Sequence, residues 1–362
     1  MVPVVGGSSP LRHLPRKKSA FGHDFSRIPL TKERLRRSRA KPGSAALKVS
    51  PVKVLASRIF PGPAWEELED VEFLEGPLPD ALGEGRPDVE ALAVVAEQVD
   101  DRTLDLLPNL RVVANYGVGY DDIDVAACAR RGVAVTNTPG VLDAATADLA
   151  FALVLAVRRR LVEADAFVRS GRWASGWAEP ELLGDDVAGA TIGIVGLGRI
   201  GQAVARRARG FDMRVLYARR NRLAPSEERE LEVEYRPLDD LLAEADVVTL
   251  HVPLTEETRG LIEGRRLALM RPGACLVNTA RGQVVDEEAL VEALVAGRLR
   301  AGLDVFAHEP RVPRALLDLP NVVLTPHIAS ATAATREAMT RVLVDNLLAA
   351  RDGRELPNRV YP

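Results

Sequence analysis

Residues 191–201 read TIGIVGLGRIG, and this run constrains the fold more than any other part of the chain. Its first five residues are apolar and mostly β-branched, as in a strand buried inside a parallel sheet. Glycines then follow with the spacing GxGxxG, which suits a tight turn, close approach of an anion to the backbone, and close packing of a helix on the strand. The run therefore predicts a strand–turn–helix unit that binds the pyrophosphate of a dinucleotide. The residues predicted to line this turn are Gly196, Gly198, Arg199, Ile200 and Gly201.

The rest of the chain alternates strands and helices, which indicates an α/β fold with parallel sheets. Apolar runs predict strands over 52–57, 91–95, 111–115, 133–137, 191–195, 214–217, 247–251, 274–278, 302–306 and 322–325. Helical patterns cover 103–107, 123–131, 144–170 and 333–350, and 171–186 is predicted as loop. The strand–helix alternation stops at residue 140, and a single long helix follows. We therefore expect two domains connected by that helix.

Charge is distributed unevenly along the 362 residues, although the net charge is only −3. The first 50 residues hold 12 lysines and arginines against two carboxylates, and the remainder is acidic. We expect residues 1–50 to be a disordered basic extension. Three interpretations are considered: a transit peptide, an arm that touches nucleic acid or a membrane, and an inert segment translated from an early start site, which is favoured. The acidic body is not expected to bind nucleic acid.

The chain has only two cysteines, Cys128 and Cys275, and no apolar run long enough to cross a bilayer. We therefore expect no disulfide framework, no metal site and no membrane partner. A reducing compartment, the cytoplasm, fits this cysteine usage.

Ligands of open parallel sheets bind beyond the carboxyl ends of the strands. Arg281, Glu309 and His327 each follow a predicted strand of the second half. An arginine can grip the carboxylate of a small 2-keto acid, and a histidine can protonate the carbonyl oxygen as hydride arrives. A glutamate can orient that imidazole. His308 and His251 are rivals, but the first lies in a polar loop and the second is expected under the cofactor.

At these residues the chain resembles the D-isomer-specific 2-hydroxyacid dehydrogenases, most closely their glyoxylate/hydroxypyruvate reductase branch. The resemblance covers residues 51–360. It rests on VANYGVGYDDID (113–124), TNTPGVLDAATADLAFAL (136–153), GLGRIGQAVARRA (196–208), HVPLTEETRGLI (251–262), NTARGQVVDEEAL (278–290), GLDVFAHEP (302–310) and NVVLTPHIASAT (321–332). It implies two Rossmann-like parallel-sheet domains with a cleft between them. One is a flavodoxin-like substrate domain of residues 51–149 and 329–362, and the other is an NAD(P)-binding Rossmann domain of residues 150–328.

The resemblance also implies roles for particular residues. Arg281, Glu309 and His327 would form the catalytic set, and backbone amides near Val118 and Gly119 would hold the substrate carboxylate. Beyond the glycine turn, the cofactor is expected to contact Arg219, Arg220, His251, Val252, Pro253, Thr258, Thr279, Ala280, Asp304 and His327. Asp304 would lie at the nicotinamide end. Homodimers are usual in the family.

Three features depart from the family pattern. The run 297–306 is one residue shorter than usual before Asp304, which leaves its strand register open. Ala329 stands where glycine is common, and its methyl group would crowd the cofactor slightly. The basic extension, residues 1–50, has no counterpart.

The cofactor preference is predicted from the strand that follows the glycine-turn helix. An NAD-preferring site places Asp or Glu about 20 residues after the turn, where it bonds the ribose 2′-hydroxyl. Here the strand 214–217 is followed by Arg219, Arg220, Asn221 and Arg222, without a carboxylate. Two or three guanidinium groups suit a 2′-phosphate, so NADP(H) is predicted over NAD(H). The alternative is a solvated surface run of arginines.

We therefore expect an oxidoreductase that reduces glyoxylate, hydroxypyruvate or a similar small 2-keto acid to the D-2-hydroxy acid, with hydride from NAD(P)H. Within the enzyme class, the alternatives are phosphoglycerate and 2-ketogluconate-type enzymes. Formate dehydrogenases pair the histidine with glutamine, so Glu309 argues against that branch. An alternative from another class is a non-enzymatic NAD(H)-sensing protein like the transcriptional co-repressors that share this fold.

Overall fold

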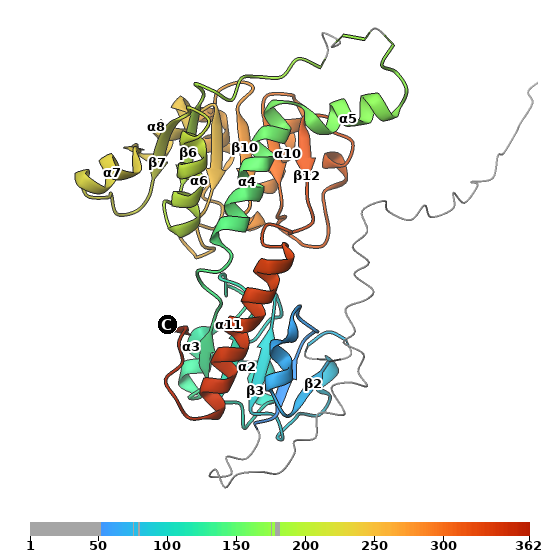
Figure 1. Ribbon diagram of the computed structural model, residues 1–362, viewed down its shortest axis with the longest axis vertical. Coiled ribbons are helices and arrows are strands. Elements are labelled where there is room, and N and C mark those ends of the chain that lie inside the picture. The colour runs from blue at the N-terminus through green and yellow to red at the C-terminus, as the bar shows by residue number, and fades with distance from the viewer. Residues whose placement is uncertain (1–51, 75, 79, 175, 178–181) are drawn as a thin grey trace, which may run out of the picture. The chain divides into compact units, whose positions relative to one another are not determined.

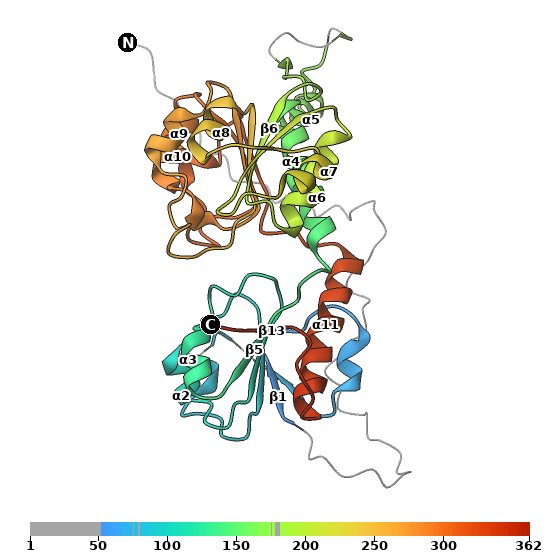
Figure 2. The ribbon, with the colours of Figure 1, turned by 90° about the vertical axis from the view of Figure 1, so that its left-hand side faces the viewer.

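The structure is a computed structural model that describes residues 52–74, 76–78, 80–174, 176–177 and 182–362. It contains two sheets, of six and seven strands, and helices cover both faces of each sheet (Figures 1 and 2). The predicted α/β class with two parallel sheets is confirmed. The predicted basic extension, residues 1–50, lies outside the described residues.

The smaller sheet has the order β13-β5-β4-β3-β1-β2 and is parallel except where β13 joins its edge. Its strands are β1 (Val54–Ala56), β2 (Val71–Phe73), β3 (Ala91–Val94), β4 (Val112–Asn115), β5 (Ala134–Thr136) and β13 (Arg359–Val360). Side chains of β4 alternate between faces: Val112 packs with α11 (Ala333–Arg351), and Val113 packs with α2 (Asp101–Asp105) and α3 (Val125–Arg130). The C-terminal helix α11 therefore covers one face of the sheet that the first part of the chain builds (Figure 2).

The larger sheet is parallel throughout, with the order β12-β11-β10-β9-β6-β7-β8. Its strands are β6 (Thr191–Val195), β7 (Arg214–Ala218), β8 (Glu234–Tyr235), β9 (Val247–Leu250), β10 (Cys275–Asn278), β11 (Arg300–Leu303) and β12 (Val322–Leu324). From β6 the chain first builds β7 and β8 on one side, then returns to add β9 to β12 on the other. The strand order thus reverses between β6 and β9, and open α/β sheets bind ligands at such a reversal.

Helices pack on both faces of the larger sheet through separate apolar cores. One face carries α4 (Asp143–Arg158) and α6 (Arg199–Arg209), and the other carries α8 (Leu238–Glu244), α9 (Gly264–Leu269) and α10 (Glu287–Val295). The remaining helices are α5 (Leu161–Arg169) and α7 (Pro225–Leu231), and 3₁₀ turns cover Pro63–Glu67, Asp80–Leu82, Gly282–Val284 and Arg314–Leu316. Within the described ranges, no helix combines the length and the apolar character needed to cross a membrane.

The prediction of a single helix over 144–170 is wrong, because the structure has two helices there, α4 and α5. α4 ends at Arg158, Arg160 has left-handed backbone with φ 52°, and α5 begins at the next residue. Packing fixes the break: the Arg158 guanidinium donates to the Asp186 carbonyl, and Gly184 lies against the Arg158 carbonyl. The segment after α5 therefore crosses the end of α4. Since no glycine or proline marks the break, the sequence pattern continues through it.

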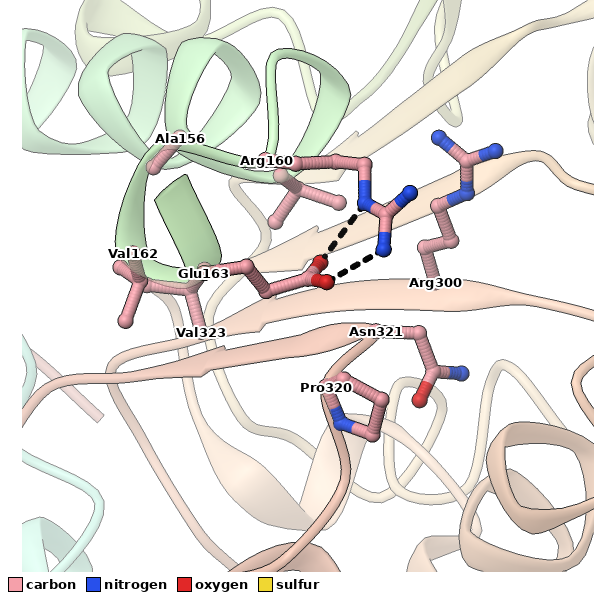
Figure 3. Close-up of a pocket in the computed structure, with 9 residues that line it drawn as sticks. Ala156, Arg160, Val162, Glu163, Arg300, Pro320, Asn321 and Val323 are labelled. Atoms are coloured by element: carbon pink, nitrogen blue, oxygen red, sulfur yellow. Dashed lines mark hydrogen bonds and ion pairs between the residues drawn. The ribbon is translucent and has the colours of Figure 1, made fainter. Parts of the chain in front are cut away.

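The turn between α4 and α5 lines a hollow of about 160 Å³ beside β11 and β12 (Figure 3). Nε of Arg160 donates to the Glu163 carboxylate at 3.0 Å on one side, and Arg300 and Asn321 line the other. Arg300 is the first residue of β11, and Asn321 directly precedes β12. The hollow therefore lies at the amino ends of these strands, opposite the edge predicted to bind ligands.

The strand predicted over 302–306 lies earlier in the structure, at β11. Its last residue, Leu303, pairs with Asn278 of β10, so Asp304 is the first residue beyond the strand. The apolar run continues because Val305 and Phe306 are buried although they lie past the end of the strand. The other nine predicted strands overlap strands of the structure, whereas the short edge strands β2, β8 and β13 were not predicted.

Candidate active site

The three glycines of the turn after β6 have different surroundings, so a side chain would have a different effect at each position. Gly196 has φ 93°, and a Cβ on it would lie 2.5 Å from the His251 carbonyl oxygen. A Cβ on Gly201 would overlap the Gly196 carbonyl, because α6 packs tightly on the turn. Gly198, the N-cap of α6, would instead carry its Cβ into space with no heavy atom within 4 Å. The turn thus leaves room at the N-terminus of α6, where unpaired backbone N–H groups and the helix dipole favour an anion.

Arg199 and Ile200 begin α6 beside this open space, and their side chains differ in setting. Nε of Arg199 donates to the Asp143 carboxylate at the start of α4, at 2.8 Å. Ile200 is half-buried. The Arg199 guanidinium is therefore paired with a protein carboxylate, although it remains largely exposed.

His327 and Glu309 meet at the carboxyl edge of the larger sheet. Nδ1 of His327 and Oε2 of Glu309 are 2.8 Å apart, and Nε2 of His327 has no hydrogen-bond partner within the described chain. Burial opposes the charge of Glu309, but the hydrogen bond and charge of His327 and the Phe306 N–H hold the pKa of that carboxyl below its usual value. Glu309 is therefore ionised at neutral pH and stabilises a protonated imidazole.

The backbone around His327 is held by Asp304, which is fully buried at the end of β11. One carboxylate oxygen accepts from the Thr325 hydroxyl at 2.6 Å and the Ile328 N–H at 2.8 Å, and the other accepts from the Ala329 N–H at 2.8 Å. The Asp304 carbonyl accepts from the His327 N–H at 2.8 Å. These bonds hold His327 at φ 52°, a left-handed conformation that is uncommon for residues other than glycine. Burial raises the pKa of Asp304, although the same hydrogen bonds oppose the shift.

Arg281 lies at the carboxyl end of β10, in a turn that Asn278 shapes. The Asn278 amide donates to the Arg281 carbonyl, and its oxygen accepts from the Ala280 N–H. Nε of Arg281 donates to both carboxylate oxygens of Asp121, at 2.9 and 3.1 Å, and Nη1 donates to the Ala280 carbonyl. Sequence reasoning missed Asp121. The available signal was its place in the DDID run that follows the loop at 117–119.

The loop after β4 lies next to the same guanidinium. A Cβ on Gly119 would overlap Nη2 of Arg281, so any larger residue here would displace the guanidinium. The Asn115 amide holds the loop by donating to the Gly119 carbonyl at 2.7 Å and the Gly117 carbonyl at 3.2 Å. Among the described residues, no acceptor pairs with the N–H groups of Val118 and Gly119. Two unpaired backbone donors beside a guanidinium suit a carboxylate ligand.

Three histidines lie within the described residues, and their settings differ. Nε2 of His251, just after β9, lies 2.9 Å from the Thr249 hydroxyl, and burial lowers the pKa of His251 to about 4. His251 is therefore neutral at physiological pH and is not a proton donor there. His308 lies in a loop, where its backbone bridges to Arg311. Of the three, His327 alone combines a carboxylate partner with an unpaired ring nitrogen.

The segment after β9, which begins at His251, closes into a small loop beside the glycine turn. The Thr258 hydroxyl accepts from the Thr255 N–H and donates to the Pro253 carbonyl at 2.6 Å. Val252 lies against the turn, since a Cβ on Gly196 would come within 2.8 Å of its Cγ1. The structure thus brings these predicted cofactor contacts to the edge where the strand order reverses.

Other predicted cofactor contacts follow β7 and β10. Arg219 and Arg220 are exposed directly after β7, and no described residue accepts a hydrogen bond from either guanidinium. The hydroxyl of Thr279, next to Ala280, is buried without a hydrogen-bond partner. An unpaired buried hydroxyl at this edge fits a bound polar ligand. Across the described part of the chain, no group of three or more His, Cys, Asp or Glu side chains is arranged to hold a metal ion.

The fold and the site define the class of dinucleotide-dependent oxidoreductases. The defining features are a parallel sheet whose strand order reverses between β6 and β9, the glycine turn, and the His327–Glu309 pair. A family profile described as D-isomer specific 2-hydroxyacid dehydrogenase, NAD binding domain, matches residues 151–329. A glyoxylate reductase from Thermococcus gammatolerans is 53% identical over 278 residues, which are 75% of this chain and 83% of that protein. The chain belongs to the D-isomer-specific 2-hydroxyacid dehydrogenases, and the predicted family and enzyme class are confirmed.

Solved structures agree with this family. A protein from Thermus thermophilus matches with a TM-score of 0.78 and 48% identity, over 85% of this chain and 100% of that chain. An NADPH-dependent glyoxylate/hydroxypyruvate reductase from Sinorhizobium meliloti, in complex with NADP and malonate, matches with a TM-score of 0.77 and 38% identity, over 86% of this chain and 97% of that one.

Proposed function

We propose that the protein reduces glyoxylate, and also hydroxypyruvate, to the D-2-hydroxy acid with NADPH as the preferred hydride donor. The observation that carries this proposal is that two groups lie at the carboxyl edges of the strands, close enough for the charge of Arg281 to lower the pKa of Glu309. One is the His327–Glu309 pair, and the other is Arg281 beside the unpaired N–H groups of Val118 and Gly119. The names of the relatives, glyoxylate reductase and glyoxylate/hydroxypyruvate reductase, support the choice of substrate.

In this proposal Arg281 and the N–H groups of Val118 and Gly119 bind the substrate carboxylate. Nε of Arg281 is committed to Asp121, and one N–H of Nη1 to the Ala280 carbonyl, so the guanidinium offers its remaining Nη donors to the substrate. These N–H donors match the two oxygens of a carboxylate. Asp121 thus fixes which side of the guanidinium faces the ligand.

His327 donates the proton to the carbonyl oxygen from Nε2, because Nδ1 is engaged by Glu309. When bound, the dihydronicotinamide supplies the hydride that adds to the carbonyl carbon. Glu309 holds the ring in one orientation and stabilises its protonated form before the transfer. Asp304 acts one step further away, since it holds the backbone that carries the ring.

The chain also offers the groups that would hold the cofactor. The open space at Gly198 would take the pyrophosphate, and the unpaired Thr279 hydroxyl would bond another polar group of the dinucleotide. Arg219 and Arg220 would bind the 2′-phosphate, which favours NADP(H) over NAD(H). The complex of the Sinorhizobium meliloti relative with NADP supports this preference.

We also propose a homodimer, which the apolar surface of α5 supports. Leu161, Val162 and Val168 are each more than half exposed, at 52%, 53% and 53%. Large apolar side chains exposed on one helix are typical of surfaces that contact another protein. Sedimentation equilibrium tests the assignment, and a monomer at micromolar concentration would contradict it.

Two further assignments are proposals of the same kind. The substrate domain would comprise residues 51–149 and 329–362, and the cofactor domain residues 150–328, which limited proteolysis can test.

A cytoplasmic location is supported by Cys128 and Cys275, both buried and unpaired. Fractionation of the source cells tests that location.

The experiment that tests the function uses the full chain with NADPH or NADH and three acids: glyoxylate, hydroxypyruvate and 2-ketogluconate. Loss of absorbance of the reduced cofactor measures turnover. Fast loss with glyoxylate, and faster loss of NADPH than of NADH, is expected. Tight NADPH binding without turnover of any acid would contradict the proposal and favour a nucleotide-sensing protein.

A further inference from the structure

The segment 219–223, which follows β7, is tied to the protein through Arg222. Nε and Nη2 of Arg222 donate to the two carboxylate oxygens of Glu228 on α7, at 2.8 and 2.9 Å. The same carboxylate accepts from the Tyr217 hydroxyl at 2.6 Å. That hydroxyl in turn accepts from the Leu223 N–H at 3.0 Å. We call this set the Arg222–Glu228 clamp, and it connects β7, the segment and α7.

The clamp joins buried groups to an exposed one, since the Arg222 side chain is 58% exposed. Tyr217 is fully buried, and the Glu228 side chain is only 11% exposed. The Tyr235 ring packs edge-on against Tyr217, and the Arg222 guanidinium lies over the Tyr235 ring, 5.2 Å from its centre. Hydrogen bonds from Arg222 and Tyr217 lower the pKa of Glu228 to about 2, and burial together with Glu228 raises the pKa of Tyr217 to about 12. Both groups therefore keep one protonation state near neutral pH.

The arginines after β7 are consequently not equivalent. Nε and Nη2 of Arg222 both donate to Glu228, whereas the guanidinium groups of Arg219 and Arg220 are exposed and donate to no described residue. The sequence suggested two or three guanidinium groups for a phosphate. The structure leaves two of them available and uses the third to hold the segment.

The carboxylates near this pair are mostly engaged. Glu227 of α7 accepts from the Ala224 N–H and caps the helix, and Glu228 is neutralised by Arg222. Glu257, after β9, is exposed; the pKa of its carboxyl is lowered first by the Thr255 hydroxyl and only last by the charge of Arg220. Glu257 is therefore the carboxylate whose charge interacts with Arg220, and Glu228 is the carboxylate whose charge the Arg222 guanidinium compensates.

We propose that Arg222 is a positioning residue for cofactor specificity, which withdraws the charge of Glu228 and presents Arg219 and Arg220 to a 2′-phosphate. This inference rests on the proposed preference for NADP(H). Without the clamp, the segment would have to be ordered on binding, which weakens affinity. Without Arg222, Glu228 would keep its bond from the Tyr217 hydroxyl but carry an uncompensated charge. That charge would repel the phosphate and offer an acceptor to a ribose 2′-hydroxyl, as acidic residues do in NAD-preferring sites.

The test compares Arg222→Gln with Arg214→Gln by calorimetric titration with NADP⁺ and with NAD⁺. Arg214 is the matched control, because it makes the same two-pronged bond to Glu234, at 2.9 and 2.7 Å, from the opposite end of β7. We expect Arg222→Gln to weaken NADP⁺ binding by about five- to tenfold, with NAD⁺ binding unchanged or tighter. Arg214→Gln should leave the ratio of the two dissociation constants as in the wild type. An equal effect on both cofactors, or no effect, would overturn the proposal.

Two more variants complete the test. Arg222→Gln/Glu228→Gln should regain part of the NADP⁺ affinity lost in Arg222→Gln, because the repelling charge is gone; no recovery would overturn the role of that charge. Arg222→Lys should shift the ratio less, and it carries the test if Arg222→Gln fails to fold. Wild-type protein that binds NAD⁺ more tightly than NADP⁺ would refute the proposed preference, whereas the change in ratio on losing Arg222 tests the clamp separately.

Discussion

Nδ1 of His327 lies 2.8 Å from Oε2 of Glu309, although the two residues follow different strands of the larger sheet. Because β11 and β12 are neighbours, the loops that follow them meet at one edge. The pairing commits one ring nitrogen to the protein and leaves the other for a ligand. The geometry therefore assigns the proton to Nε2 in the proposed reduction.

Replacing His327 by glutamine removes this proton donor while keeping a polar side chain. The kcat for glyoxylate should fall by about 10²- to 10⁴-fold, the usual contribution of a general acid. The dissociation constant of NADPH should change little. His308→Gln is the control and should retain near-normal turnover. Near-normal kcat in the His327 variant would exclude the assignment.

Glu309→Gln tests the pH dependence of stability. The pKa of Glu309 is lower in the folded chain than its ordinary value, so its ionised form stabilises the fold above that ordinary value, about 4.3. This stabilisation is lost as the pH falls through the folded pKa. The difference in free energy of unfolding between wild type and variant should be largest near neutral pH and shrink in acid. Urea unfolding at several pH values measures it; a difference that grows in acid would show the wrong sign.

Gly119→Ala tests the contact between the loop after β4 and Arg281. The added methyl group would overlap Nη2 of the guanidinium and displace it. The KM for glyoxylate should rise by about tenfold, a loss comparable to one charge-assisted hydrogen bond. Gly117→Ala is a matched control, since its Cβ would meet nothing closer than 3.7 Å. Equal KM values for the two variants would contradict the placement of Arg281.

Gly198→Ala and Gly201→Ala should separate binding from folding. The methyl group of the first enters open space at the N-terminus of α6, so the melting temperature should hold while NADPH binding weakens. The methyl group of the second overlaps the Gly196 carbonyl and should cost about 1–3 kcal/mol of stability. Thermal unfolding and calorimetric titration distinguish the two. Unchanged NADPH affinity in Gly198→Ala would place the cofactor elsewhere.

Arg219→Asp with Arg220→Ser tests the proposed 2′-phosphate contacts directly. The change removes two exposed cations and supplies the acid that an NAD-preferring site uses. The ratio of kcat/KM with NADPH to that with NADH should fall by at least tenfold. An unchanged ratio would mean that these arginines form only a solvated surface.

Much of the fold could be predicted because buried parallel strands are apolar runs of the right length. The run through Val305 and Phe306 misled the prediction, since side chains beyond a strand can be buried as deeply as those within it. The break at Arg160 was missed because packing against the segment near Gly184 causes it, and no local residue signals it. Short edge strands such as β8 carry too few residues to show a pattern.

For the candidate site, Arg281, Glu309 and His327 were selected because each follows a strand. Asp121 was missed, since its bond to Arg281 joins residues 160 positions apart and depends on tertiary structure. The role of Arg222 was invisible for the same reason. Sequence shows three arginines in a row of four residues, whereas only the packing of Tyr217 and Glu228 shows which one is engaged.

Asp304 makes the site sensitive to the length of the chain as well as to its chemistry. The Asp304 carboxylate reaches the turn of His327 because Asp304 is the first residue after β11, whose last residue, Leu303, pairs with Asn278. Deleting a single residue within β11, between Arg300 and Leu303, would pull this carboxylate back into the sheet and release the imidazole. Such a deletion would inactivate the protein while leaving every ligand-facing side chain intact. In a lineage of related proteins, insertions and deletions should therefore be tolerated in the turn 297–299 more readily than within β11, which agrees with the one-residue difference from the family pattern in the run 297–306.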